Sequence, residues 1–329
     1  MERLWSKVTN AYQRNGLIEI GSKSLDLALS KFKLYNLYID KNIIEQKRYV
    51  DRLTNSGFGI PLYNKNIQTH KSSDELFILG SGSSINDISQ DQWEYIGSQD
   101  SIGLNRWPLH DFTPTYYVFE VPSKDLGVQM RIDFWNLLNH KRDEYSSIPI
   151  ILKDIRRFHN TNLNKHPDWL SKSILLSPDI VLPPVLSNSR KEFRSVLQYI
   201  NQTGYFSNNS SMEYLFKKVG SISYLIILGC KLGYEKIILC GVDMVNNKYF
   251  WDHKRDELKQ KDIPIPESSR SNKQEIHSTN DPSVHNITLE EIIYELNEIV
   301  LKDKNIDLYT ETKVSSLYPR IPHYNTHTN

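Results

Sequence analysis

The chain has 329 residues, in which 40 Lys and Arg against 39 Asp and Glu leave a net charge of +1. A dedicated nucleic-acid binder normally carries a clear excess of positive charge, so this balance argues against nucleic acid as a partner. Hydrophobic residues make up 39% and charged residues 24%, which is typical of a globular protein and not of a disordered one. Cys230 and Cys240 are the only cysteines, too few for a disulfide scaffold or a zinc ribbon.

The sequence shows no targeting or membrane-spanning signal. Its start, MERLWSKVTNAYQRNG, lacks the apolar core of a secretory signal. The most apolar stretch, from Val219 to Val242, is interrupted by charged residues, whereas a spanning helix needs about 20 nearly uninterrupted apolar residues. We therefore expect a soluble cytoplasmic protein whose thiols stay reduced.

Residues 1–72 form the first predicted unit. From Leu25 to Leu53, apolar residues recur at helical spacing with basic residues between them, which predicts one or two amphipathic helices. We expect this N-terminal helical segment to pack on the main domain. Attachment to the inner face of a membrane and contact with a second copy of the chain, as in a homo-oligomer, are the alternatives.

Residues 73–329 form the second predicted unit, in which short apolar runs alternate with helical patterns. This alternation predicts an α/β, Rossmann-like fold with a doubly wound, mostly parallel sheet. Strands are expected at 75–79, 101–105, 115–121, 148–152, 236–240 and 306–309, and helices at 124–139, 210–232 and 288–301. Residues 156–210 fit no clear pattern, and prolines exclude a central strand throughout 180–184. The polar stretch 247–276 is expected to form a lid over a site.

Polar turns follow several of the predicted strands, where ligands bind in an open parallel sheet. Gly80 and Gly82 permit a tight turn whose backbone N–H groups suit a phosphate, but Gly80–Ser84 is neither a complete G-x-G-x-x-G nor a P-loop and could equally bind nothing. Asp243, after the strand 236–240, could accept hydrogen bonds from a sugar or could simply hold its own turn.

Histidines near the predicted lid are candidates for a general base, because imidazole can take up a proton near neutral pH. His277 directly follows the polar stretch, and His253 and His285 are its competitors. No Asp-x-Asp pair is evident, which disfavours a metal-dependent nucleotide-sugar transferase.

These segments occur in a recognisable order. The chain reads Gly80-Ser-Gly-Ser-Ser84, Asn105, Gly220-Ser221, Leu232-Gly-Tyr-Glu-Lys-Ile237, Gly241-Val-Asp243 and His277-Ser278. The series resembles the bacterial sialyltransferases of glycosyltransferase family 42, which have a Gly-Asn-Gly-Pro-Ser turn, a strand-ending Asn, Thr-Ser-Gly, Leu-Gly-Tyr-Lys-Glu-Ile, Gly-Ile-Asp and, after a lid, His-Ser. The resemblance covers 75–110 and 210–320.

The resemblance implies an inverting transferase that uses a CMP-activated nonulosonic acid and needs no metal or other cofactor. Carried over by position, the residues that would bind the donor nucleotide and its sugar are Gly80, Ser81, Gly82, Ser83, Asn105, Ser221 and Asp243. His277 would be the catalytic base, with His285 as the runner-up because the family's base lies closer to the final helix. Tyr249, with Lys248 or Lys254, would support the leaving phosphate, and Lys218 would hold an anionic acceptor.

The sequence also departs from the family. Ser81 replaces the Asn of the glycine turn, Ile222 replaces a Gly, and Val245 stands where the family has one of two tyrosines. These changes leave the donor open among sialic, legionaminic and pseudaminic acids and Kdo. The expected acceptor is a bacterial surface glycan of lipopolysaccharide or capsule. The alternatives are the related Rossmann-like flagellin-modifying transferases and pterin diphosphokinases, or a non-catalytic binding module in envelope glycan assembly.

Overall fold

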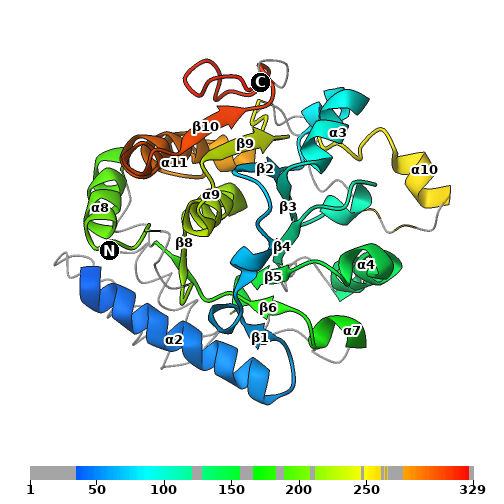
Figure 1. The fold of residues 1–329 in the computed structure, drawn as a ribbon, viewed down its shortest axis with the longest axis horizontal. Coiled ribbons are helices and arrows are strands. Elements are labelled where there is room, and N and C mark those ends of the chain that lie inside the picture. Colours follow the sequence, from blue (N-terminus) through cyan, green and yellow to red (C-terminus); the bar gives the residue numbers. More distant parts are fainter. Residues whose placement is uncertain are drawn as a thin grey trace.

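The structure is a computed structural model that describes residues 35–120, 128–155, 166–182, 189–207, 212–245, 248–260, 263, 265 and 277–325. Figure 1 shows one central sheet with helices on both of its faces. The strands are β1 (Ile60–Pro61), β2 (Glu75–Leu79), β3 (Asp100–Leu104), β4 (Tyr116–Glu120), β5 (Ile150–Lys153), β6 (Leu175–Leu176), β7 (Asp179–Val181), β8 (Leu215–Lys217), β9 (Lys236–Cys240) and β10 (Asp307–Thr310). The helices are α2 (Tyr35–Asn55), α3 (Gln90–Gly97), α4 (Val128–His140), α5 (Arg142–Tyr145), α7 (Asp168–Ser171), α8 (Arg190–Gln202), α9 (Gly220–Leu232), α10 (Arg255–Gln260) and α11 (Leu289–Leu296).

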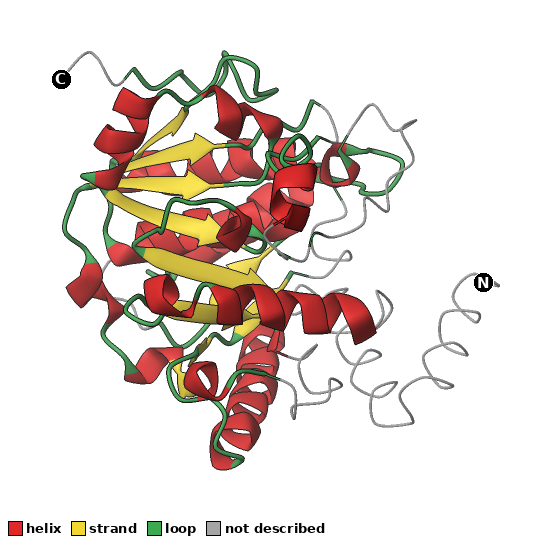
Figure 2. Ribbon diagram, turned by 90° about the vertical axis from the view of Figure 1, so that its right-hand side faces the viewer, coloured by secondary structure: helices red, strands yellow, loops and turns green. Residues whose placement is uncertain are grey.

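The central sheet has eight strands in the order β1-β6-β5-β4-β3-β2-β9-β10, and all of its pairs are parallel. Figure 2 shows the strand arrows pointing to the same side of the molecule. From β2 the chain builds outward through β3 to β6, and it later returns to the other side of β2 to add β9 and β10. The sheet is therefore doubly wound, as the sequence predicts, with its switch point between β2 and β9.

The central strands are buried along their whole length. Every residue of β2 is buried, and so are the last four of β9, because a parallel sheet covered on both faces needs near-continuous apolar strands. Helices α8, α9 and α11 cover one face, and α3, α4 and α7 cover the other (Figure 1). The strands predicted at 75–79 and 236–240 are confirmed to the residue.

Helix α9 differs from the prediction at its start. The sequence predicts a helix from Ser210 to Leu232, but Leu215–Lys217 form β8, which pairs with β7 in a second, two-stranded parallel sheet. Val219 and Gly220 have positive φ angles of 41° and 60°, which interrupt a helical path, so the helix begins only at Gly220. Its predicted end is confirmed, because Gly233 adopts the left-handed conformation of a C′ residue.

The described part of the predicted N-terminal segment belongs to the same folded unit. Tyr38 of α2 is buried against the main core, and Ile60 and Pro61 extend the eight-stranded sheet as its edge strand β1. The predicted packing of an amphipathic helix on the main domain is confirmed for α2. The predicted helical residues before Tyr35 lie outside the described residues.

The segments that the sequence left unassigned, or assigned to a lid, contain regular structure. Between 166 and 207, β6 joins the central sheet, β7 pairs with β8, and α8 packs on α11. Within the predicted lid, Phe250 and Trp251 are buried in the core, where the Phe250 ring contacts Trp107, and α10 follows. Most of 261–276 lies outside the described residues, so a lid there stays a prediction.

The final helix carries a capping box, in which Thr288 and Glu291 satisfy each other's backbone N–H groups. A π-helical turn, Asn297–Leu301, prolongs α11 before β10 and completes the helix predicted over 288–301. None of the described helices is both long enough and apolar enough to cross a membrane.

Candidate functional site

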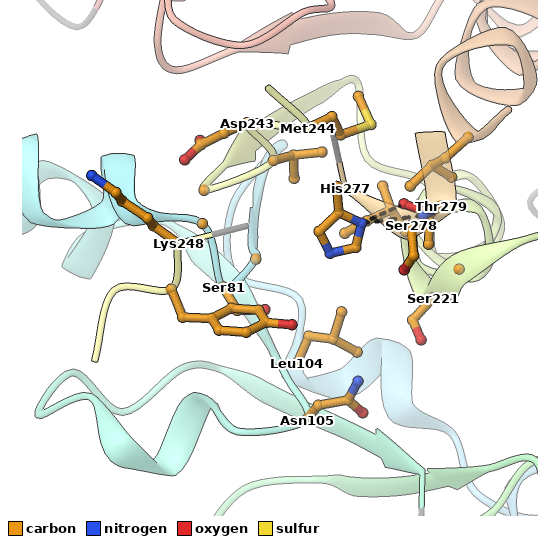
Figure 3. Close-up of a pocket in the computed structure, with 18 of the residues that line it drawn as sticks. Ser81, Leu104, Asn105, Ser221, Asp243, Met244, Lys248, His277, Ser278 and Thr279 are labelled. Atoms are coloured by element: carbon orange, nitrogen blue, oxygen red, sulfur yellow. Dashed lines mark hydrogen bonds between the residues drawn. The ribbon is translucent and has the colours of Figure 1, made fainter. Parts of the chain in front are cut away.

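A cavity of about 290 Å³ opens at the carboxyl ends of β2, β3, β4 and β9 and at the N-terminus of α9. Because β2 and β9 meet at the switch point of the sheet, the loops that follow them diverge toward opposite faces and leave a crevice. Figure 3 shows side chains from these separate segments converging on one space. The predicted donor-binding residues that line it are Gly80, Ser81, Gly82, Asn105, Ser221 and Asp243.

Two glycine turns meet at the floor of the cavity. The Gly80 N–H donates to the Cys240 carbonyl and the Gly82 N–H donates to the Gly241 carbonyl, both at 2.8 Å. A Cβ atom at Gly80 would lie 2.5 Å from the Gly241 carbonyl oxygen, so a larger residue cannot fit without moving the backbone. Glycine is therefore required here by the close approach of two strand ends.

Asp243 holds the turn that follows β2. It is 3% exposed, its Oδ2 accepts the Ser84 N–H at 3.1 Å, and its Oδ1 accepts the Ser84 hydroxyl. Figure 3 shows its carboxylate directed away from His277. Of the two roles that the sequence left open, holding the turn is the one that these hydrogen bonds support.

Asn105 is fixed by its neighbours on β4. Its φ of 51° is left-handed, a conformation that Asn tolerates better than most residues. Its Oδ1 accepts the backbone N–H of Glu120 at 3.2 Å, and its carbonyl accepts the Tyr117 hydroxyl. With Oδ1 occupied, the amide nitrogen points up into the cavity (Figure 3).

The N-terminus of α9 forms another wall. Gly220, Ser221 and Ile222 line the cavity there, in the first turn of a 13-residue helix whose initial N–H groups have no partner within the helix. Such a terminus favours an anion, and the Ser221 hydroxyl lies beside it.

His277 lies in the middle of the lining (Figure 3). It is the N-cap of the short 3₁₀ helix Ser278–Asn280, and its Nδ1 lies 2.8 Å from the Thr279 hydroxyl oxygen. His285, the other predicted candidate for the base, does not line the cavity. It lies in the following turn, where its backbone N–H donates to the Asp281 carbonyl.

Tyr249 also lines the cavity and is held from two sides. It forms an isolated antiparallel bridge with Gly82, and its ring stacks on Trp251 with 4.4 Å between the centroids and 8° between the planes. Lys248 lines the cavity as well, but its side chain extends away from His277 (Figure 3), and Lys254 lies outside the lining.

Two further predicted residues are described but do not line the cavity. The carbonyl of Ser83 accepts the Asn86 side-chain amide on the outer side of the turn. Lys218 is 8% exposed and bonds Ser223 through its backbone, and burial lowers the pKa of its amine to about 8.

Glu120 is a lining residue that the sequence analysis missed. It is the last residue of β4 and lies within the strand predicted at 115–121, where the sequence gives it no role in a site. Its ion-pair partners Lys153 and Lys217 lie 33 and 97 positions away in the sequence, so no local sequence pattern predicts these pairs. The available signal was its place, since a polar residue that ends a buried parallel strand lies at the edge where ligands bind.

Glu311 lies close to the site, after β10. Its Oε2 is buried and has no hydrogen-bond partner among the described residues. Burial, reinforced by the charges of Asp243 and Asp87, raises its pKa to about 7. These carboxyl groups do not form a metal site, since the described residues contain no group of three or more His, Cys, Asp or Glu that could hold an ion. Metal independence stays a prediction.

Among known proteins, only solved structures match this chain. No protein-family model matches the chain, and no curated protein matches its sequence. In structure, the chain resembles sialyltransferases. The monofunctional alpha-2,3-sialyltransferase Cst-I from Campylobacter jejuni is 16% identical with a TM-score of 0.42, and the match covers 78% of this chain and 82% of that one. A variant of the sialyltransferase Cst-II in complex with CMP is 17% identical with a TM-score of 0.41, covering 76% and 86%. CstII from Campylobacter jejuni in complex with cytidine-5'-monophosphate is 16% identical with a TM-score of 0.38, covering 74% and 82%. At these identities the likeness concerns the fold alone.

Proposed function

We propose that this protein is a glycosyltransferase that moves a nonulosonic or ulosonic acid from a CMP-activated donor to a hydroxyl of a glycan acceptor, with His277 as the general base. One observation carries the proposal. The glycine turn after β2, the Asn105 amide, the α9 N-terminus, Tyr249 and His277 come from distant parts of the sequence and surround a single cavity at the switch point of the sheet. The motif series in the sequence resembles a family that uses these positions together.

The cavity offers a place for each part of such a donor. The turn Gly80–Gly82 lines the cavity and can hold the nucleotide, and its close packing against Gly241 and Asp243 is possible because Gly80 and Gly82 lack side chains. The N-terminus of α9, with Ser221, suits the anionic carboxylate or phosphate. Tyr249, with its ring held against Trp251, can donate a hydrogen bond to the departing phosphate without a reorganisation of the ring.

The reaction follows from this arrangement. His277 takes the proton of the acceptor hydroxyl as its oxygen forms a bond to the anomeric carbon, and the bond from that carbon to the phosphate oxygen breaks with both electrons leaving on CMP. CMP is already a good leaving group, so the protein mainly orients the reactants, excludes water and stabilises the phosphate charge. A bacterial surface glycan is the acceptor that we propose.

A ligand-binding test separates this proposal from its alternatives. Calorimetric titrations with CMP, CDP and ATP, each with and without Mg²⁺, should show binding of CMP that does not depend on Mg²⁺. A screen of CMP-activated acids, read by mass spectrometry of released CMP and glycosylated acceptor, then identifies the donor. Binding of ATP with Mg²⁺ and none of CMP would point to a diphosphokinase, and binding of CMP without transfer to any acceptor would point to a non-catalytic module.

A further inference from the structure

A cluster of charged side chains lies behind one wall of the cavity, at the carboxyl ends of β4, β5 and β8. Lys153 Nζ lies 2.5 Å from Glu120 Oε2, and Lys217 Nζ lies 3.3 Å from the same oxygen. Lys217 Nζ also lies 2.5 Å from Asp154 Oδ2, and Asp179 accepts the Asp154 backbone N–H at 2.8 Å. Charges buried in this way are stable only when they are paired, and each of the two lysines contacts a carboxylate here.

Glu120 is the member of this cluster that lines the cavity. Its side chain is 25% exposed, whereas that of Lys153 is fully buried and those of Lys217 and Asp154 are 10% and 11% exposed. The lysines therefore reach the carboxylate from the protein side. Burial lowers the pKa of Lys217, but Glu120, Asp154 and Asp179 outweigh burial and raise it above its ordinary value, so this lysine is a cation at neutral pH.

Asn105 and Glu120 present complementary groups to the cavity. Because Asn105 Oδ1 accepts the Glu120 backbone N–H, the amide nitrogen of Asn105 is the atom turned toward the ligand space (Figure 3). The carboxylate at the end of the neighbouring strand can only accept hydrogen bonds when ionised. A donor and an acceptor on adjacent strand ends match the hydroxyl groups of a sugar, each of which both donates and accepts.

We propose that Glu120 is a specificity-determining residue, whose carboxylate accepts a hydrogen bond from a hydroxyl of the donor's sugar-acid portion while Asn105 donates to the same portion. This inference rests on the proposed function. Since Lys153 and Lys217 already contact the Glu120 carboxylate from the protein side, it does not need a cationic ligand as a partner, and a neutral hydroxyl suits it. The anionic groups of the donor belong at the other wall, where the α9 N-terminus and Ser221 lie.

A matched pair of substitutions tests this role. Glu120→Gln and Asp154→Asn each replace a carboxylate that contacts Lys217 by an amide of the same shape, but only Glu120 lines the cavity. Asp154 has a left-handed φ of 57°, which Asn also tolerates, so its replacement does not strain the backbone. We expect Glu120→Gln to bind CMP within about twofold of the wild type and the CMP-activated acid from the donor screen about 10–100-fold more weakly. Asp154→Asn should keep both affinities within about twofold.

The outcomes separate this inference from the proposed function. If the wild type does not bind CMP, the proposed function fails. If CMP binding is normal but the two variants weaken donor binding equally, or Glu120→Gln does not weaken it, Glu120 is only part of a structural ion cluster and the inference is overturned. Should Glu120→Gln fail to fold in a thermal melt, the wild type is titrated with donors that lack one hydroxyl at a time. One of these modified donors should bind at least about 10-fold more weakly than the complete donor. Equal affinity for the complete donor and all of the modified ones overturns the inference.

Discussion

The Nδ1 atom of His277 lies 2.8 Å from the hydroxyl oxygen of Thr279, and the Thr279 backbone N–H donates to the same Nδ1 at 3.3 Å. Both contacts influence which ring nitrogen can act as a base. The nitrogen away from Thr279 can take a proton only if Nδ1 carries the hydrogen of the neutral ring. The backbone N–H favours an Nδ1 without a hydrogen, whereas the hydroxyl oxygen can accept a hydrogen from Nδ1. The Thr279 hydroxyl is therefore the group that supports the tautomer that the proposed mechanism needs.

Replacing Thr279 should therefore impair turnover without removing any group that reacts. Thr279→Val keeps the shape and removes the acceptor for Nδ1, and we expect turnover to fall about 10-fold while the affinity for CMP stays unchanged. Thr279→Ser restores a hydroxyl and should recover most of the loss, in a steady-state assay of CMP release. Equal rates for the Val and Ser variants would show that the hydroxyl does not orient the ring.

The identity of the base is tested by two histidine variants. His277→Ala should lower turnover by about 10²–10⁴ and leave CMP binding nearly intact, because the imidazole acts on the acceptor proton and does not hold the nucleotide. His285→Ala is the control, since His285 lies outside the lining of the cavity, and should keep wild-type turnover. A wild-type rate for His277→Ala together with a loss for His285→Ala would move the base to His285.

The contact between Asp243 and Ser84 should couple stability to nucleotide binding. In Asp243→Asn, one of the two oxygens that receive hydrogen bonds from Ser84 becomes an NH₂ group, which cannot accept them. We expect the free energy of unfolding in urea to fall by about 1–3 kcal/mol, and the affinity for CMP to fall because the glycine turn loosens. Ser84→Ala loses only the hydroxyl bond and should show a smaller effect on both. A loss of CMP affinity at unchanged stability would instead indicate direct contact between Asp243 and the nucleotide.

The sequence predicts the central strands of the sheet more accurately than the shorter elements around them. The strands at 75–79 and 236–240 are continuous apolar runs ended by glycine. Such runs are typical of the central strands of a parallel sheet, which are buried on both faces. The pattern wrongly predicts a helix at Leu215–Lys217, because three residues are too few to show a period of two and their partner β7 lies far earlier in the chain. The glycine turns were visible as motifs, whereas Glu120 was missed because its lysine partners are brought to it only by the fold.

Glu311 should make stability depend on pH. Its pKa is raised from 4.5 to about 7, mainly by burial and then by the charges of Asp243 and Asp87. Between these two pH values the folded protein holds a proton that the unfolded chain has released. Protons are therefore released on unfolding, and this group makes the free energy of unfolding fall as pH rises from about 4.5 to 7.

Glu311→Gln removes this titration, because an amide cannot ionise. We expect the variant to gain stability relative to the wild type as pH rises from 5 to 8, by about 1–3 kcal/mol in urea unfolding at each pH. Glu298→Gln is a suitable control, since Glu298 is an exposed residue paired with Lys302 on the protein surface, and its difference from the wild type should stay nearly constant with pH. A Glu311→Gln curve parallel to that of the wild type would mean that the carboxyl group stays ionised in the folded protein, which would require that water reaches Oε2.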